Sequence, residues 1–341
     1  MPVMKIFNWG PICLLALTAC ADGGKGTYTY ARPLMGTIVN LTICADTKRT
    51  ADSAAQKAFE AIEEVERLMS PKSEAGDVFR LNEQAALRPV RISPRTFMLI
   101  QRANEVAART GGAFDVSFAA LERLWNWKDP GFVPPQAAEV TRALPLINYR
   151  NLRLNPMTNE VSFAFTGMKV GLGGIAKGYA SQCAVEALSE AGIRDAIVAS
   201  AGDIQVMGAK DGEPWRVGLQ HPREKSILCA ILMRDGDAVS TSGDYERYAE
   251  YGGVRYHHIM DPKTGYPARG FVSVSVISKS AVDSDAYSTA LFVMGPGKVE
   301  RFIKEHPELQ VIVIDEQMRV SASKGLKERI KSEGAIAVRW M

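Results

Sequence analysis

The sequence is poor in the residues that form disulfide frameworks or bind soft metal ions. It has 5 cysteines and 4 histidines among 341 residues, with no C-x-x-C pair and no H-E-x-x-H motif. Cys44, Cys183 and Cys229 each lie among aliphatic neighbours, so we expect small buried hydrophobic residues and not a disulfide framework. Any metal site must therefore be built from oxygen ligands.

Long runs of like charge are also missing. The formal net charge is +3, the two signs are interspersed, and no block is rich in lysine and arginine. The electrostatic signature of a nucleic-acid-binding protein is therefore absent. Hydrophobic residues make up 46% of the chain, which is enough for one large globular unit or two closely packed lobes.

A short apolar run lies near the N-terminus, between Lys5 and Cys20. A charged start followed by a short apolar segment and small residues is typical of a secretory signal, and the run is too short for a membrane span. "LTAC" (17–20) resembles a bacterial lipobox, so we expect residues 1–19 to be a lipoprotein signal peptide and Cys20 to carry lipid. A plain cleaved signal with a chance cysteine is the alternative. Residues 20–31 begin with a Gly-rich stretch and are predicted to be a tether at the periplasmic face of the cell membrane.

The rest of the chain predicts runs of strands broken by a few long helices. Helical spacing indicates helices at 52–70, 93–112, 175–192 and 281–294. Alternating or continuous apolar stretches indicate strands at 37–45, 152–155, 160–165, 168–172, 195–208, 214–222, 227–233, 237–245, 256–260, 272–278, 311–316 and 335–341. This order favours an α+β fold with mixed or antiparallel sheets flanked by helices over a doubly wound α/β fold.

A glycine-rich turn, "VGLGGIAKGYA" (170–180), comes before the third helix. It superficially matches a dinucleotide-binding fingerprint, but Asp195 begins its strand, whereas the ribose contact needs an acid at a strand's end. Free N–H groups at a helix start, close backbone approach and the charge of Lys177 still indicate a phosphate-facing turn. An ordinary tight turn with a surface lysine is the alternative.

The apolar helix at 281–294 carries an acid and an alcohol, Asp285 and Thr289, at positions i and i+4. These positions share a helix face, so both oxygens can reach one point. A hard cation, Mg²⁺ or Ca²⁺, suits such ligands. Alternatively, Asp285 favours the positive end of the helix and Thr289 bonds back to a carbonyl.

Two histidines are adjacent in "YHHIMDPKTGYP" (256–267). If they lie on a strand, His257 and His258 point to opposite faces and cannot chelate one ion, so at most one serves a site. A general base and a purely structural histidine both remain open. The nearby "STSGDYERY" (240–248) suits a phosphorylated aromatic ligand but also describes an ordinary turn.

Taken together, these segments resemble the ApbE family of FAD:protein FMN transferases. The match extends from about Arg32 to Gly295 and keeps the family order. Its eight segments are "LMGTIVNLTI" (34–43), "MSPKSEAGDVFRLN" (69–82), "GGAFDVSFAALERLWNW" (111–127), "LGGIAKGYA" (172–180), "VASAGDIQVMG" (198–208), "STSGDYERY" (240–248), "HHIMDPKTGYP" (257–267) and "SDAYSTALFVMG" (284–295).

The resemblance implies an ApbE-like (T-fold-like) domain over 32–341, with two closely packed lobes and a cleft for FAD. Such enzymes use FAD and Mg²⁺ outside the cytoplasmic membrane. They pass the FMN moiety to a threonine or serine hydroxyl of a partner protein, releasing AMP and leaving a phosphoester link. An FAD pyrophosphatase and a non-catalytic flavin-binding lipoprotein are the alternatives.

The same resemblance implies roles for ten positions. His258 would be the base that activates the acceptor hydroxyl. The metal ligands would be Asp285, Thr289 and the backbone carbonyl of Gly174. The residues that border FAD would be Met35, Ala113, Phe114, Asp115, Gly171 and Lys177.

Three positions depart from the family pattern. Lys72 replaces a common tyrosine, Gly171 replaces the usual aspartate before "LGG", and Ala201 replaces the first glycine of "GGD". We therefore expect activity with altered flavin contacts.

Overall fold

The computed structural model describes residues 25–331 and 337–341. The predicted signal peptide and the predicted lipidation site at Cys20 lie outside these residues. Among the helices that the model describes, none combines the length and the apolar character that crossing a bilayer requires.

The predicted α+β class is confirmed. The centre of the molecule is a nine-stranded sheet, counted over the described residues, in the order β1-β2-β6-β7-β10-β13-β14-β15-β17. Neighbours are antiparallel except β15 and β17, which are parallel. The strands are β1 Gly26–Leu34, β2 Thr37–Ala45, β6 Asp195–Ser200, β7 Asp203–Met207, β10 Ala238–Gly243, β13 Phe271–Ser278, β14 Gln310–Asp315, β15 Val320–Ala322 and β17 Val338–Trp340.

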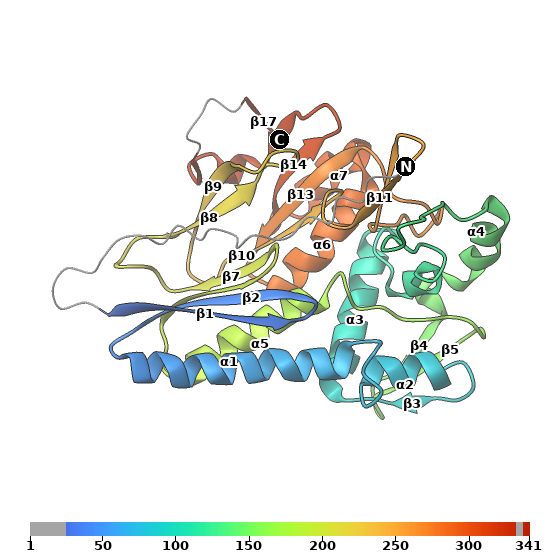
Figure 1. Ribbon diagram of the computed structural model, residues 1–341, viewed down its shortest axis with the longest axis horizontal. Coiled ribbons are helices and arrows are strands. Elements are labelled where there is room, and N and C mark those ends of the chain that lie inside the picture. The colour runs from blue at the N-terminus through green and yellow to red at the C-terminus, as the bar shows by residue number, and fades with distance from the viewer. Residues whose placement is uncertain (1–24, 332–336) are drawn as a thin grey trace.

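Helices cover one face of this sheet (Figure 1). The long helix α1 (Lys48–Met69) starts where the Thr47 hydroxyl accepts a hydrogen bond from the N–H of Thr50 (3.2 Å), and its buried stripe repeats every three or four residues. It packs on α5 (Ala176–Glu190), which packs in turn on α6 (Ala281–Met294). The other helices are α2 Asp77–Gln84, α3 Pro94–Arg109, α4 Ala137–Ala143 and α7 Pro296–Glu305, with 3-10 turns η1 Val116–Leu121, η2 Leu144–Leu146, η3 Tyr149–Asn151 and η4 Lys324–Leu326.

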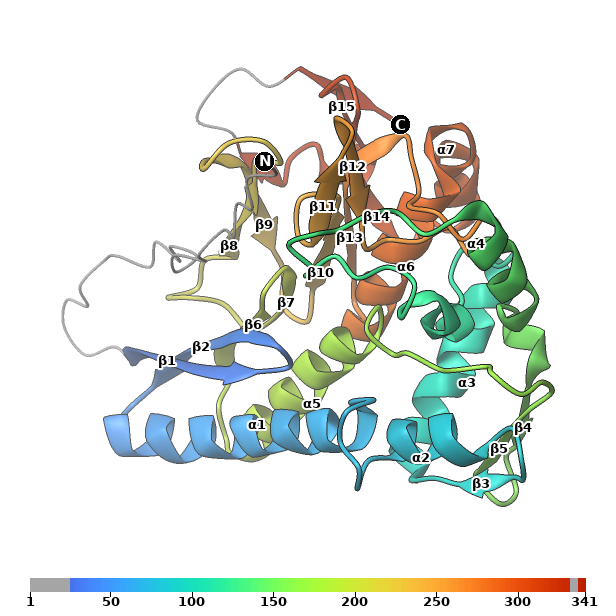
Figure 2. The ribbon, with the colours of Figure 1, turned by 45° about the vertical axis from the view of Figure 1, so that its right-hand side comes forward.

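A three-stranded sheet in the order β16-β9-β8 packs against the opposite face. Strand β8 (Trp215–Gln220) alternates strictly between buried and exposed residues, and its apolar side joins β9 (Ile227–Met233) in a second core with the large sheet. Figure 2 shows β8 and β9 side by side above β1 and β2. The remaining strands are β3 Val90–Arg91, β4 Leu152–Asn155, β5 Glu160–Phe163, β11 Tyr248–Tyr251, β12 Val254–His257 and β16 Ile330–Lys331.

Three predicted boundaries are wrong. The predicted tether extends too far, because residues from Gly26 onward form β1, which pairs along its whole length with β2. The predicted strand at 168–172 pairs with no strand in the described part of the chain, because the side chain of Asn82 bonds both the N–H (2.7 Å) and the carbonyl (3.0 Å) of Val170. The predicted single strand at 195–208 is a hairpin, with β6 and β7 joined at Ala201 and Gly202.

This hairpin places Ala201 in a left-handed backbone conformation, with φ of 56°. A Cβ atom makes that conformation costly, and glycine avoids the cost. We expect Ala201→Gly to raise the free energy of unfolding by about 0.5–1 kcal/mol, after the greater entropy of an unfolded glycine is subtracted. Urea denaturation measures the difference. Ala199→Gly, two residues earlier inside β6, is the matched control and should destabilise the protein; equal effects at both positions would contradict the explanation.

Candidate active site

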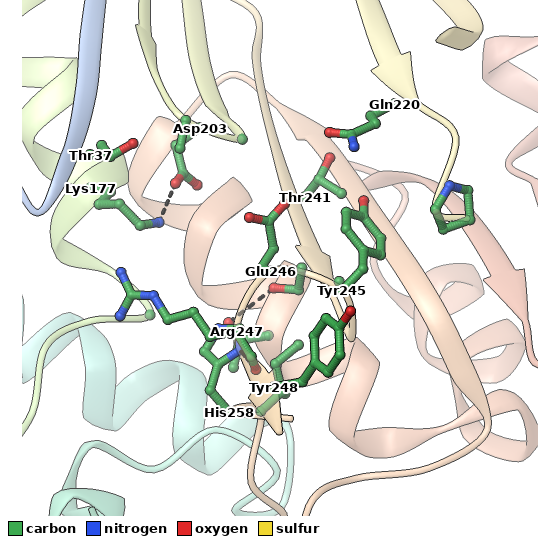
Figure 3. A pocket seen from close by; sticks show the side chains of 18 of the residues that line it. Thr37, Lys177, Asp203, Gln220, Thr241, Tyr245, Glu246, Arg247, Tyr248 and His258 are labelled. Atoms are coloured by element: carbon green, nitrogen blue, oxygen red, sulfur yellow. Dashed lines mark hydrogen bonds and ion pairs between the residues drawn. The ribbon is translucent and has the colours of Figure 1, made fainter. Parts of the chain in front are cut away.

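A cavity of about 2880 Å³ opens between the N-terminal hairpin, the start of α5, α6 and the segment from β10 to β12. Figure 3 shows Lys177 and Asp203 on one side of it and Arg247 and His258 on another. The structure brings all ten predicted site residues to this cavity: Met35, Ala113, Phe114, Asp115, Gly171, Gly174, Lys177, His258, Asp285 and Thr289.

The carboxylate of Asp285 is buried at the junction of α6 and α5. One oxygen accepts a hydrogen bond from the N–H of Gly178 (2.9 Å), and the other lies 3.8 Å from the ammonium of Lys177. Gly178 must be glycine, because a Cβ there would lie 2.2 Å from the carbonyl oxygen of Ala281. Burial, followed by the negative charge of Asp203, raises the pKa of Asp285 to about 7.

Lys177 lies between two carboxylates in the first turn of α5. Its ammonium forms an ion pair with Asp203 at the start of β7, in addition to the longer contact with Asp285. Burial lowers the pKa of Lys177, but the two carboxylates outweigh burial, and the net shift is upward. The lysine is thus a permanent cation on the cavity wall, positioned by the turn that the sequence predicts to face phosphate.

The hydroxyl of Thr289 lies one helical turn beyond Asp285 and faces two other elements. It is 3.2 Å from the Ser242 hydroxyl on β10. A Cβ on Gly174 would lie 3.3 Å from the Thr289 oxygen and 3.2 Å from the Phe114 ring. The backbone of the glycine turn therefore lies directly against this hydroxyl, as the predicted oxygen-ligand set requires.

The two adjacent histidines have different surroundings. The ring of His257 is fully engaged, because Nε2 donates to the carbonyl of Ala268 (2.8 Å) and Nδ1 accepts from the N–H of Ile259 (3.3 Å). The half-buried ring of His258 lines the cavity, and its Nδ1 is 3.3 Å from the Arg247 carbonyl. Since a carbonyl can only accept, Nδ1 carries the proton, and Nε2, which has no partner within 25–331 and 337–341, keeps its lone pair.

Both histidines are neutral in the folded protein. Burial, with a further contribution from Arg247, lowers the pKa of His258 to about 3. Burial lowers the pKa of His257 to about 4. The neutral form is the protonation state from which an imidazole accepts a proton, but a pKa lowered this far also makes His258 a weaker base than a free histidine.

The lowered pKa of His257 predicts a loss of stability in acid. Between pH 6.5 and 4 the unfolded chain binds a proton at this residue that the folded chain does not, so stability is complete above pH 6.5 and falls toward pH 4. At pH 5 the loss is about 2 kcal/mol. His257→Gln should remove this part of the pH dependence, measured by urea denaturation at pH 7.5 and pH 5. His306→Gln, after α7, is the control, and an unchanged slope in the His257 variant would contradict the assignment.

Met35 reaches the cavity from a strained turn. Leu34 and Thr37 pair across a two-residue loop in which Met35 has φ of 55° and Gly36 has φ of 69°. Such a hairpin turn favours Asn-Gly or Gly-Gly, so methionine is an unfavourable residue for the turn itself. Backbone strain of this kind is commonly found at functional sites.

Two residues predicted to border FAD, Asp115 and Gly171, offer the cavity no side-chain polar group. The carboxylate of Asp115 does not reach into the cavity, because it accepts from the N–H and hydroxyl of Ser117 (2.9 and 2.6 Å) and from the N–H of Tyr149 (2.8 Å). It orders the turn that presents Phe114. At Gly171, a Cβ would lie 3.1 Å from the Cβ of Ala119, so the family's usual aspartate requires a local shift. Lys72 is not among the residues that line the cavity.

Comparison with known proteins decides the family. The model of the ApbE family matches residues 35–313, which is most of the chain. The chain belongs to the ApbE family.

Individual relatives agree with this assignment. The FAD:protein FMN transferase of Treponema pallidum (strain Nichols) is 31% identical, with 94% of each chain covered. The crystal structure of the ApbE protein of Thermotoga maritima MSB8 is 32% identical, with a TM-score of 0.83 over 89% of this chain and 99% of that one. The flavin transferase ApbE from Vibrio cholerae is 28% identical, with a TM-score of 0.79 and the same coverage.

Among the residues of this ApbE-family site that the sequence does not predict as site residues, three contact the predicted ones or supply charge: Asp203, Ser242 and Arg247. Asp203 is the acid of the "AGD" motif, and the other two belong to the hydroxyl-rich segment. Both motifs can be seen in the sequence, but neither shows which of its side chains face the site. Figure 3 shows the Arg247 side chain extending toward the Lys177 side of the cavity. Among the described residues the structure gives the Arg247 guanidinium no hydrogen bond or ion pair, so this cation is available to a ligand.

Proposed function

We propose that this chain transfers the FMN moiety of FAD to a threonine or serine hydroxyl of a partner protein and releases AMP. The observation that carries the proposal is that the Nε2 of His258, which has no partner among the described residues, lies in the same cavity as Lys177, Asp285 and Thr289. The cavity is therefore lined by a candidate base, a lysine cation and a set of oxygen ligands. The names of the relatives, FAD:protein FMN transferase and flavin transferase, support the same activity.

The reaction is a displacement at the flavin-side phosphorus of FAD. His258 Nε2 takes the proton of the acceptor hydroxyl, and the hydroxyl oxygen forms a bond to phosphorus. The bond from that phosphorus to the bridging oxygen breaks, and AMP leaves with the electron pair. Lys177 and Arg247 place positive charge beside the diphosphate, where negative charge builds during the displacement.

The chain's donors fit a hard divalent cation, which we include in the proposal as Mg²⁺ or Ca²⁺. The ligands would be the Asp285 carboxylate, the Thr289 hydroxyl and the Gly174 carbonyl. The described residues hold no cluster of three histidine, cysteine or acidic side chains, and a site with few protein ligands leaves positions for substrate phosphates. When bound, the ion would supply positive charge to the diphosphate.

The proposal extends to the cell envelope. We place the mature chain on the periplasmic face of the cell membrane, anchored by lipid on Cys20, as a membrane lipoprotein with a palmitate-type anchor. The partner is a flavoprotein subunit or domain that presents the acceptor hydroxyl. Labelling of expressing cells with a palmitate analogue, with and without globomycin, tests the anchor. Cys20→Ser should abolish the label.

Intact-mass analysis tests the activity. The protein is incubated with FAD, Mg²⁺ and a candidate acceptor domain, with and without chelator; we expect an FMN-sized mass gain on the acceptor that the chelator abolishes. Because Asp285 must be ionised to bind a cation, limiting Mg²⁺ should make the rate fall below pH 7, and added Mg²⁺ should restore it. Release of AMP and free FMN, with no gain on any acceptor, would instead identify an FAD pyrophosphatase.

A further inference from the structure

One strand that lines the active-site cavity has an unpaired edge. In the small sheet β8 pairs with β9, and among the described residues no strand pairs with its other edge. The consecutive residues Arg216, Val217 and Gly218 all line the cavity. Val217 faces the core and its two neighbours face outward, so the cavity wall includes both sides of β8 beside its unpaired edge. The same cavity continues across β9 to Lys331 on β16.

The cavity is larger than one small ligand requires. Its volume is about 2880 Å³, whereas a site for a single small molecule or cofactor occupies about 300–1,000 Å³. The proposed FAD contacts and His258 lie on the N-terminal hairpin, α5, α6, the segment after β10 and the residues 113–115 and 171–174. The wall formed by β8, β9 and the loop 221–226 carries none of them, which leaves room for a second occupant in the same cavity.

The chemistry of this wall is basic and partly apolar. Arg216 on β8 and Lys331 on β16 line the cavity, are exposed, and have no hydrogen bond or ion pair to any described residue. Ile227 on β9 is 57% exposed, pairs with Gln220, and extends its side chain over Gly218. It adds an exposed apolar group to this wall beside the basic side chains.

A simpler explanation of β8 is edge protection. Exposed charge and a bulge, both present here at Arg216 and between Leu219 and Gln220, discourage edge-to-edge aggregation. Edge protection would be a sufficient explanation if this edge faced bulk solvent. This edge instead lies along a cavity that leads to the proposed general base, and a protective role does not account for that position.

We propose that the edge of β8 docks an extended, acidic segment of the acceptor polypeptide, by strand addition, with the acceptor hydroxyl directed to His258. The inference depends on the proposed transferase activity and specifies its protein substrate. Main-chain hydrogen bonds to β8 supply affinity for an extended segment, as in other cases of strand addition. Arg216, on β8 itself, selects an acidic residue beside the hydroxyl.

Two short synthetic peptides test this inference. Each carries one central threonine, flanked by glutamates in the first and by lysines in the second, and FMN transfer is followed by peptide mass. We expect the glutamate peptide to be the better substrate. Arg216→Glu should raise its KM about tenfold and reduce the preference between the peptides, the change that loss of one favourable charge contact produces. Lys331→Glu, on the opposite edge of the small sheet, should change both less.

FAD binding, measured by flavin fluorescence, separates the two proposals. It should be unchanged in both variants, and Arg153→Glu on β4, far from the cavity, is the control that should change nothing. Three results would each overturn the docking inference. The first is equal labelling of the two peptides, and the second is no peptide labelling by a protein that modifies an intact acceptor. The third is weakened FAD binding in the Arg216 variant. Failure to bind FAD, or to modify any acceptor, would instead overturn the transferase assignment.

Discussion

Replacing Asp285 by asparagine is expected to reduce FMN transfer at least about 10²-fold. Asparagine keeps the shape of the side chain and can still accept the hydrogen bond from Gly178, so the fold should be retained. What it loses is the negative charge that pairs with Lys177 and that a divalent cation requires. The measurement is the initial rate of mass gain on an acceptor over a range of Mg²⁺ concentrations.

The same helix offers a matched control. Asp283 lies two residues earlier, pairs with Arg102 at 2.8 Å and does not line the cavity. Asp283→Asn should cost about 0.2–1 kcal/mol of stability and leave the transfer rate as it is. If both variants lost activity equally, the effect would come from damage to α6 and not from the carboxylate at the site.

Replacing His258 by glutamine is expected to lower the transfer rate by about 10²–10⁴-fold. Glutamine can still donate to the Arg247 carbonyl, but it cannot take a proton from the acceptor. Binding of FAD, followed by flavin fluorescence, should be little changed, because the cations Lys177 and Arg247 remain.

The neighbouring histidine makes this test specific. His257→Gln removes an imidazole one residue away whose two nitrogens are both engaged, so it should affect stability in acid and not the transfer rate at neutral pH. Full activity of the His258 variant would exclude a general-base role. A rate loss accompanied by equally weakened FAD binding would show that His258 holds the ligand instead.

Much of the site could be predicted because its parts are local in sequence. Asp285 and Thr289 are one helical turn apart, and helical spacing alone brings them to one face. The separation of His257 from His258 is also predicted, but for a reason that is only partly right: β12 ends at His257, and His258 lies just beyond the strand and not on its opposite face. The glycine turn before α5 places Lys177 in the first helical turn, where the structure shows it.

The features that the sequence does not predict depend on contacts between distant segments. The ion pair of Lys177 with Asp203 exists because the chain reverses at Ala201. The sequence does not predict this reversal, because alanine is not a strong turn residue and the apolar run around it is typical of a single strand. The pattern predicts a tether in place of β1 because the first residues of the strand follow a Gly-rich stretch and none of its residues is fully buried, and β2 fixes its pairing. The side chain of Asn82 replaces a strand neighbour at Val170, a role that spacing cannot reveal.

The turn at Met35 has a consequence for engineering. A procedure that selects each residue for local backbone preference would introduce asparagine or glycine there, and about 1–2 kcal/mol of strain would disappear. The same change would delete the thioether from the cavity wall. At this position a more heat-resistant protein is expected to be a poorer catalyst, so libraries built for thermal tolerance should leave residue 35 untouched.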